Sequence, residues 1–167
     1  MTWCTIFRAG MLQRRYPFTN YLQLWGGSRD PHADNVRMPR TVLIVEDVET
    51  CAATLEIAFS AVHDIDVVTV MGGEQAWRAV QRAGNLAAIV TDLQMPDLDG
   101  YELIERVRAH DRHGSVPIVV ITGSSDPDVP ERVQRLGANA FFSKPYSPVA
   151  VREKLEQLLE SHDSTKN

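Results

Sequence analysis

The sequence predicts an α/β domain built on one parallel sheet with helices on both faces. Three observations lead to this fold class: short continuous apolar runs recur along the chain, helical stretches separate them, and 44% of the 167 residues are apolar. An apolar run without polar alternation is typical of a strand that is buried on both faces. Strands that alternate with helices require a parallel sheet covered on both sides.

The five expected strands share an apolar, mostly β-branched composition and cover residues 41–45, 65–70, 87–90, 117–121 and 138–142. A helix is expected after each strand because apolar residues recur there at helical spacing. These stripes are Ala52, Leu55, Phe59 and Val62; Ala76, Ala79, Val80 and Ala83; Leu103, Ile104 and Val107; Val129, Val133 and Leu136; and Val151, Leu155 and Leu158. Gly137 is expected to end the fourth helix, since glycine tolerates positive φ.

Five strand–helix units joined by right-handed crossovers favour the flavodoxin-like (βα)5 doubly wound sheet with strand order 2-1-3-4-5. In such sheets ligands bind outside the carboxyl ends of the strands. We therefore expect functional side chains directly after the apolar runs.

The pattern divides the chain into an N-terminal extension (1–39), a domain (40–162) and a C-terminal tail (163–167). The extension lacks periodicity, and residues 1–40 hold six arginines against two aspartates. Three interpretations stay open for it: a disordered tail, upstream sequence translated from a misplaced start with Met38 as the true one, or a basic arm that docks on a partner or on anionic lipid. So few residues follow the last helix that we expect a domain acting without an attached output domain.

Composition excludes several classes of protein. No stretch approaches the roughly 20 consecutive apolar residues of a membrane span. Two cysteines cannot form a disulfide framework, which favours a reducing, cytoplasmic location. Residues 41–167 carry a net charge of -9, which disfavours direct nucleic-acid binding because phosphate backbones are also anionic.

Charged and polar residues follow four of the expected strands: Glu46 and Asp47, then Asp92, Thr122 and Lys144. Three carboxylates crowded together repel one another unless a cation joins them, and oxygen ligands suit Mg²⁺ or Mn²⁺. A carboxylate beside a divalent cation and an ammonium group can attack phosphorus to form an acyl phosphate.

The motifs at these strand ends are Val-Leu-Ile-Val-Glu46-Asp47, Thr91-Asp92-Leu-Gln-Met-Pro-Asp-Leu-Asp-Gly, Ile121-Thr122-Gly and Ser-Lys144-Pro. Together they resemble the receiver domain of response regulators in two-component signalling, over about residues 40–161. The resemblance implies a stand-alone protein similar to CheY.

By this resemblance Asp92 is the phosphoacceptor and Lys144 pairs first with it and then with the phosphoryl group. Asp47, Asp92 and the main-chain carbonyl of Gln94 would bind Mg²⁺, with Glu46 acting mostly through water. The Lys144–Pro145 peptide bond would be cis.

The resemblance also implies a switch. A phosphoryl group on Asp92 would recruit the Thr122 hydroxyl, Phe141 would rotate inward, and the face formed by the last two helices and the fifth strand would repack. The expected donor is a histidine kinase or a histidine phosphotransfer protein, and the downstream protein target stays unknown. The protein would not be a dedicated enzyme: it would phosphorylate itself and lose phosphate slowly. It would be a monomer or a phosphorylation-dependent dimer.

Other functions remain as alternatives. A receiver-like domain could bind partners independently of phosphorylation, although such domains usually lose one of the key residues. A Mg²⁺-dependent phosphatase would need a second acid where Gln94 stands. A flavin protein would need a phosphate loop where Glu46-Asp47-Val48-Glu49 would repel phosphate.

Overall fold

The computed structural model describes residues 39–166, with only the backbone at residues 165 and 166. This part of the chain forms the strands β1 (Arg40–Val45), β2 (Ile65–Val70), β3 (Leu86–Thr91), β4 (Ile118–Thr122) and β5 (Ala140–Ser143). The helices are α1 (Glu49–Phe59), α2 (Gly73–Arg82), α3 (Gly100–Arg108), α4 (Val129–Arg135) and α5 (Pro148–Lys166). The interpretations of the N-terminal extension concern residues that lie almost entirely outside the described ones.

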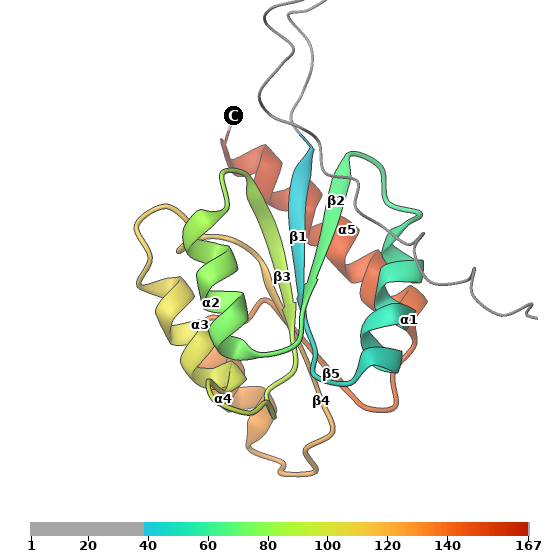
Figure 1. Cartoon of the computed structure of the whole chain (residues 1–167), viewed down its shortest axis with the longest axis vertical. Helices are drawn as coiled ribbons and strands as arrows, with labels where there is room; N and C mark the ends of the chain where they lie inside the picture. Colours follow the sequence, from blue (N-terminus) through green and yellow to red (C-terminus); the bar gives the residue numbers. More distant parts are fainter. Residues whose placement is uncertain (1–38, 167) are drawn as a thin grey trace, which may run out of the picture. The chain divides into compact units, whose positions relative to one another are not determined.

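All strands are parallel and their order is β2-β1-β3-β4-β5, which confirms the predicted flavodoxin-like fold. Helices α1 and α5 cover one face of the sheet, and α2, α3 and α4 lie on the other (Figure 1). In residues 39–166 no helix combines the length and the apolar character that crossing a membrane requires.

Two buried clusters hold the helices to the sheet. The α1–α5 cluster includes Leu55 and Phe59 of α1 with Val151 and Leu155 of α5. The cluster on the other face, here the α2–α4 cluster, includes residues of all three helices: Ala76, Val80, Leu103, Ile104, Val107, Val129 and Val133. Residues 42–45 of β1 and all of β3 and β4 are almost completely buried, as their continuous apolar runs predict, whereas β2 and β5 at the two edges are only partly buried.

The register aligns the carboxyl ends of the central strands. Val45, the last residue of β1, is paired with Thr91, the last residue of β3. Thr122, which ends β4, is paired with Ser143, which ends β5. The residues that follow these four strands therefore meet at one edge of the sheet.

The helices differ from the sequence-based expectation in three respects. Helix α1 ends at Phe59, so Val62 lies in the next turn, where its N–H donates to the Phe59 carbonyl. Leu159 is the buried residue near the end of α5, and Leu158 is half-buried.

The third difference concerns the C-terminus. The sequence predicts a tail from residue 163, but α5 continues to Lys166. A guanidinium nitrogen of Arg40 lies 2.6 Å from the Asp163 carboxylate, so this last stretch of helix is attached to the start of β1. The apolar pattern gave no sign of this polar contact.

Candidate functional site

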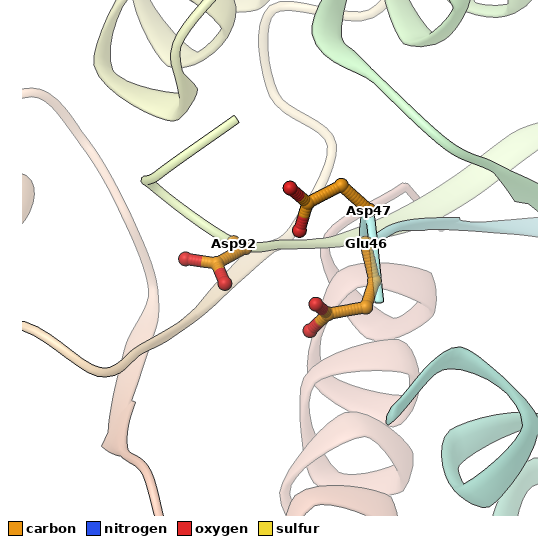
Figure 2. Close-up of side chains that lie close together, drawn as sticks. All are labelled: Glu46, Asp47 and Asp92. Carbon is orange, nitrogen blue, oxygen red and sulfur yellow. The ribbon is translucent and has the colours of Figure 1, made fainter. Parts of the chain in front are cut away.

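Three carboxylates meet where β1 and β3 end. One oxygen each from Glu46, Asp47 and Asp92 lies within 4.8 Å of the other two. Figure 2 shows how they gather: Glu46 and Asp47 come from the end of β1, and Asp92 faces them from the end of β3. The structure thus brings together the three acids that the sequence places after neighbouring strands.

Asp92 is only 6% exposed, and its carboxylate is held by donors from two segments. Its Oδ1 accepts from the main-chain N–H groups of Leu93 at 2.5 Å and Gln94 at 3.0 Å. Its Oδ2 accepts from Nζ of Lys144 at 2.6 Å. These charge-assisted hydrogen bonds fix the orientation of the carboxylate.

Lys144 also binds Glu46, a pairing that the sequence did not predict. The Glu46 side chain is 2% exposed, and both of its carboxylate oxygens accept from Nζ of Lys144, at 2.8 and 3.1 Å. Burial by itself would lower the pKa of Lys144, but the hydrogen bonds and charges of Asp92 and Glu46 outweigh it and raise that pKa. Lys144 is therefore held in its charged form as it links two buried acids.

The donor set fits a divalent metal ion. Asp47 is exposed at the mouth of the cluster, while Glu46 and Asp92 lie at its base. Three carboxylates beside one ammonium group leave an excess of negative charge, and oxygen ligands are those that Mg²⁺ prefers. The acidic cluster could accordingly hold such an ion. Gln94 is exposed two residues beyond Asp92.

Thr122 and Phe141 lie on β4 and β5, the two strands that follow β3 in the sheet order. Thr122 is completely buried at the end of β4, and its Oγ1 accepts from the N–H of Ser124 at 3.3 Å. Phe141 of β5 is partly buried and packs against the α2–α4 cluster. Phe142 points to the opposite face and packs against the α1–α5 cluster.

The loop after Asp92 packs tightly against the strand. Gly100, the first residue of α3, has no room for a side chain, since a Cβ there would lie 2.3 Å from the Asp92 carbonyl oxygen. The N–H of Gly100 donates to the Leu93 carbonyl at 3.0 Å. Asp99 caps α3 by accepting from the N–H of Glu102 at 2.8 Å. The sequence indicated a turn here, but not its contact with the Asp92 main chain.

The segment after β5 completes the site. The Lys144–Pro145 peptide bond is cis, as the resemblance implied. Tyr146 follows, and burial raises its pKa, assisted by the nearby Cys51 and Glu46. The sequence gave no sign that Tyr146 lies near these acids.

Comparison with known proteins agrees with this geometry. The family model described as "response regulator receiver domain" matches residues 42–156. The chain therefore belongs to the receiver domain family of two-component response regulators.

Two relatives illustrate the similarity. Chemotaxis protein CheY1 of Helicobacter pylori strain J99 is 29% identical over 122 residues, which is 73% of this chain and 98% of that relative. The crystal structure of a putative response regulator from Chloroflexus aurantiacus is 30% identical, with a TM-score of 0.67 over 73% of this chain and 98% of the other.

A third similar structure contains a metal. It is the receiver domain of a sensor histidine kinase from Pseudomonas aeruginosa PAO1, which has a magnesium ion coordinated in its active site cleft. It is 26% identical, with a TM-score of 0.65 over 73% of this chain and 98% of that domain.

Proposed function

We propose that this chain is a response regulator that accepts a phosphoryl group on Asp92, with Mg²⁺, from a phosphohistidine of a sensor kinase or of a histidine phosphotransfer protein. The observation that carries the proposal is the position of Asp92. Its carboxylate lies beside two other carboxylates and 2.6 Å from the Lys144 ammonium group. An anionic phosphoryl donor can approach only where such a cation offsets the acids.

The proposed ligands of Mg²⁺ are the carboxylates of Asp47 and Asp92 and the main-chain carbonyl of Gln94, with Glu46 acting through water. The magnesium ion in the active site cleft of the similar Pseudomonas aeruginosa domain supports the choice of metal. When bound, Mg²⁺ supplies positive charge beside the acceptor; Mn²⁺ could replace it.

The transfer itself is a substitution at phosphorus. A carboxylate oxygen of Asp92 forms the new O–P bond as the P–N bond of the phosphohistidine breaks, and the imidazole keeps that electron pair and gains a proton. Lys144 neutralises charge on the phosphoryl oxygens. Its ammonium group already sits beside Asp92, so it needs little reorganisation.

The response to phosphorylation is proposed to run through β4 and β5. The Thr122 hydroxyl would donate to a phosphoryl oxygen, Phe141 would rotate inward, and the α4-β5-α5 face would change its surface. A downstream protein, still unidentified, would bind that face, and the chain would be a monomer or would dimerise on phosphorylation. No direct nucleic-acid contact is proposed.

The proposal treats the chain as a phosphoacceptor rather than a dedicated enzyme. Gln94 and Ser124 supply neither an acid nor a base that could speed hydrolysis, so the acyl phosphate would be lost slowly. A cytoplasmic location belongs to the proposal as well, supported by the low cysteine content.

The test is to incubate the protein with acetyl phosphate and Mg²⁺ and to weigh it intact. We expect the mass increment of one phosphoryl group for the native chain and none for Asp92→Asn. The matched control is Asp97→Asn, the same change at an exposed position of the same loop, and we expect it to be labelled like the native chain. Its positive φ of 71° is one that asparagine adopts readily.

Equal labelling of the native protein and Asp92→Asn would place the phosphoryl group elsewhere and refute the proposal. No labelling, under conditions that phosphorylate another receiver domain, would favour the alternative of an interaction domain that works without phosphorylation.

A further inference from the structure

Helix α4 is short and is held firmly at its C-terminal end. It spans only Val129–Arg135, and the chain leaves it through Gly137, whose φ is +96°. The Gly137 carbonyl accepts two hydrogen bonds from Arg108 of α3, at 2.7 and 3.1 Å. The same guanidinium group donates to the carbonyls of Gly114 and Val116 and to Oδ1 of Asn139. This end of α4 is therefore tied to α3 and to the start of β5.

The other end of α4 is attached differently. Its N-cap residue, Asp128, makes no side-chain capping bond. Val129 is buried beneath it, and one turn later Arg132 lies on the outer surface. The guanidinium carbon of Arg132 is 3.8 Å from the centroid of the Tyr101 ring on α3. A cation over an aromatic face at this distance is attractive, but weakly so at an exposed position.

Tyr101 belongs to the rigid surroundings of the phosphoacceptor. It directly follows Gly100, whose Cα packs against the Asp92 main chain. Its ring packs against the α2–α4 cluster, as Phe141 does. The Tyr101–Arg132 contact therefore joins α4 to the start of α3, which packs closely on the Asp92 main chain.

The connection from β4 to α4 leads into the N-terminal end of that helix. Residues 123–128 link Thr122 to α4. A displacement of the Thr122 end of this connection reaches the N-terminal half of α4 first, whereas Arg108 restrains the C-terminal half. Such a displacement would act on the contact between Arg132 and Tyr101, because Arg132 lies in this half of the helix.

From these contacts we propose that Arg132 and Tyr101 form a latch that holds the N-terminal half of α4 on α3 in the unphosphorylated protein. The proposal rests on the proposed function, because it assigns the latch to the resting state of the phosphoacceptor. A contact present in only one of two states favours that state by its own free energy. Removing the latch therefore makes the phosphorylated conformation easier to reach, and linkage requires that phosphoryl mimics then bind more tightly.

The test compares beryllium trifluoride affinity, measured with Mg²⁺, among variants of the full chain. Arg132→Met and Tyr101→Leu both remove the latch, and we expect each to raise the affinity about two- to fivefold. Tyr101→Phe keeps an aromatic face and is expected to match the native protein. Arg135→Met is the matched control, because Arg135 is an exposed arginine of the same helix whose partner is Glu131.

Two further measurements separate a latch from a general loss of packing. The double variant of Arg132→Met and Tyr101→Leu should bind the probe no more tightly than either single variant, because both changes remove one interaction. Amide hydrogen exchange in the unphosphorylated protein should become faster in the N-terminal half of α4 and stay unchanged at Gly137.

Several results would overturn the proposal. If Arg132→Met and Tyr101→Leu bind beryllium trifluoride like the native protein, or more weakly, while Asp92 still accepts phosphate, the contact is not specific to the resting state. If the native chain binds neither phosphate nor beryllium trifluoride, the proposed function is wrong, and the latch proposal, which rests on it, is wrong as well. Independent, additive effects of the two substitutions would refute a shared interaction.

Discussion

Lys144 is one ammonium group shared by two buried carboxylates. Its Nζ is 2.6 Å from Asp92 and 2.8 Å from Glu46, and both acids are nearly inaccessible to water. Buried carboxylates of this kind are tolerated only when they are paired. The lysine therefore contributes to the stability of the folded domain as well as to the chemistry of the site.

The raised pKa of Lys144 predicts a loss of stability at alkaline pH. Below the ordinary lysine pKa, the group is charged in both the folded and unfolded states, and the stabilisation by the ion pairs is fully present. Above that pKa the unfolded chain releases the proton while the folded protein keeps it, so the free energy of unfolding falls as pH rises. We expect this decline in urea titrations to begin at about pH 10 and to continue as the pH rises further.

Lys144→Arg is the control for this prediction, because a guanidinium group stays charged throughout the range. Its stability should decline less with pH than that of the native protein. Parallel declines in the two proteins would show that other groups cause the alkaline loss.

Asp47 is the acid of the cluster that faces solvent, and its charge is expected to destabilise the metal-free protein. Asp47→Asn removes repulsion from Asp92 and Glu46, so we expect the free energy of unfolding in EDTA to rise by about 1 kcal/mol. The same variant should lose most of the stabilisation that added Mg²⁺ gives the native protein. Thermal unfolding with and without Mg²⁺ measures both effects.

Asp66→Asn, at an exposed position of β2, provides the comparison. It should leave both the metal-free stability and the response to Mg²⁺ nearly unchanged. An Asp47→Asn protein that is less stable in EDTA, or that is still stabilised by Mg²⁺ to the native extent, would argue against a shared metal site.

At the residue scale the sequence predicts which side chains meet, but not how they pair. Glu46, Asp47, Asp92, Thr122 and Lys144 could be found because each follows a recognisable strand. The contact between Lys144 and Glu46 could not be predicted, because it depends on the direction in which the Glu46 side chain points after the end of the strand. The main-chain amides of Leu93 and Gln94 leave no trace in the residue types.

At the scale of elements, the start of α3 packs directly on the end of β3. Gly100→Ala would place a methyl group 2.3 Å from the Asp92 carbonyl oxygen. Neither backbone segment can yield without moving the acceptor, so we expect a destabilisation of about 1–3 kcal/mol and slower phosphorylation by acetyl phosphate.

Gly84→Ala is the matched substitution for this prediction, since nothing lies within 4 Å of the position that its Cβ would take. In chemical denaturation and in acetyl phosphate labelling, we expect Gly84→Ala to have nearly the native free energy of unfolding and the native labelling rate. A Gly100→Ala protein with native stability and a native labelling rate would show that α3 can shift freely relative to β3.

Element boundaries were harder to predict than the elements. Strand β2 begins and ends where the β-branched run does. Gly137 follows the end of α4 and has the expected positive φ. The stripe through Val62 suggested a longer α1, because helical spacing continues into the turn after Phe59. The end of α5 depends on the ion pair between Arg40 and Asp163, which are far apart in the sequence.

At the scale of the whole molecule, the two buried clusters and the acidic site, as far as the described residues 39–166 form them, are built from positions beyond 40. We therefore expect that deletion of residues 1–37 changes the free energy of unfolding by no more than about 0.5 kcal/mol and leaves phosphorylation unaffected. Thermal unfolding and acetyl phosphate labelling of the shortened and full-length chains test this expectation. A large fall in melting temperature would show that the N-terminal segment stabilises the domain.

The sheet order gives the strands unequal freedom. Strand β3 is hydrogen-bonded on both sides, to β1 and β4, whereas β5 pairs with β4 alone among the described strands. Asp92 directly follows β3, and moving this strand would break the hydrogen bonds to two neighbouring strands. Phe141 is in β5, and moving that strand would break the hydrogen bonds to β4 alone among the described strands. Such a domain would keep the reacting atoms at the end of β3 aligned, while the β5 edge of the sheet remains free to change its conformation.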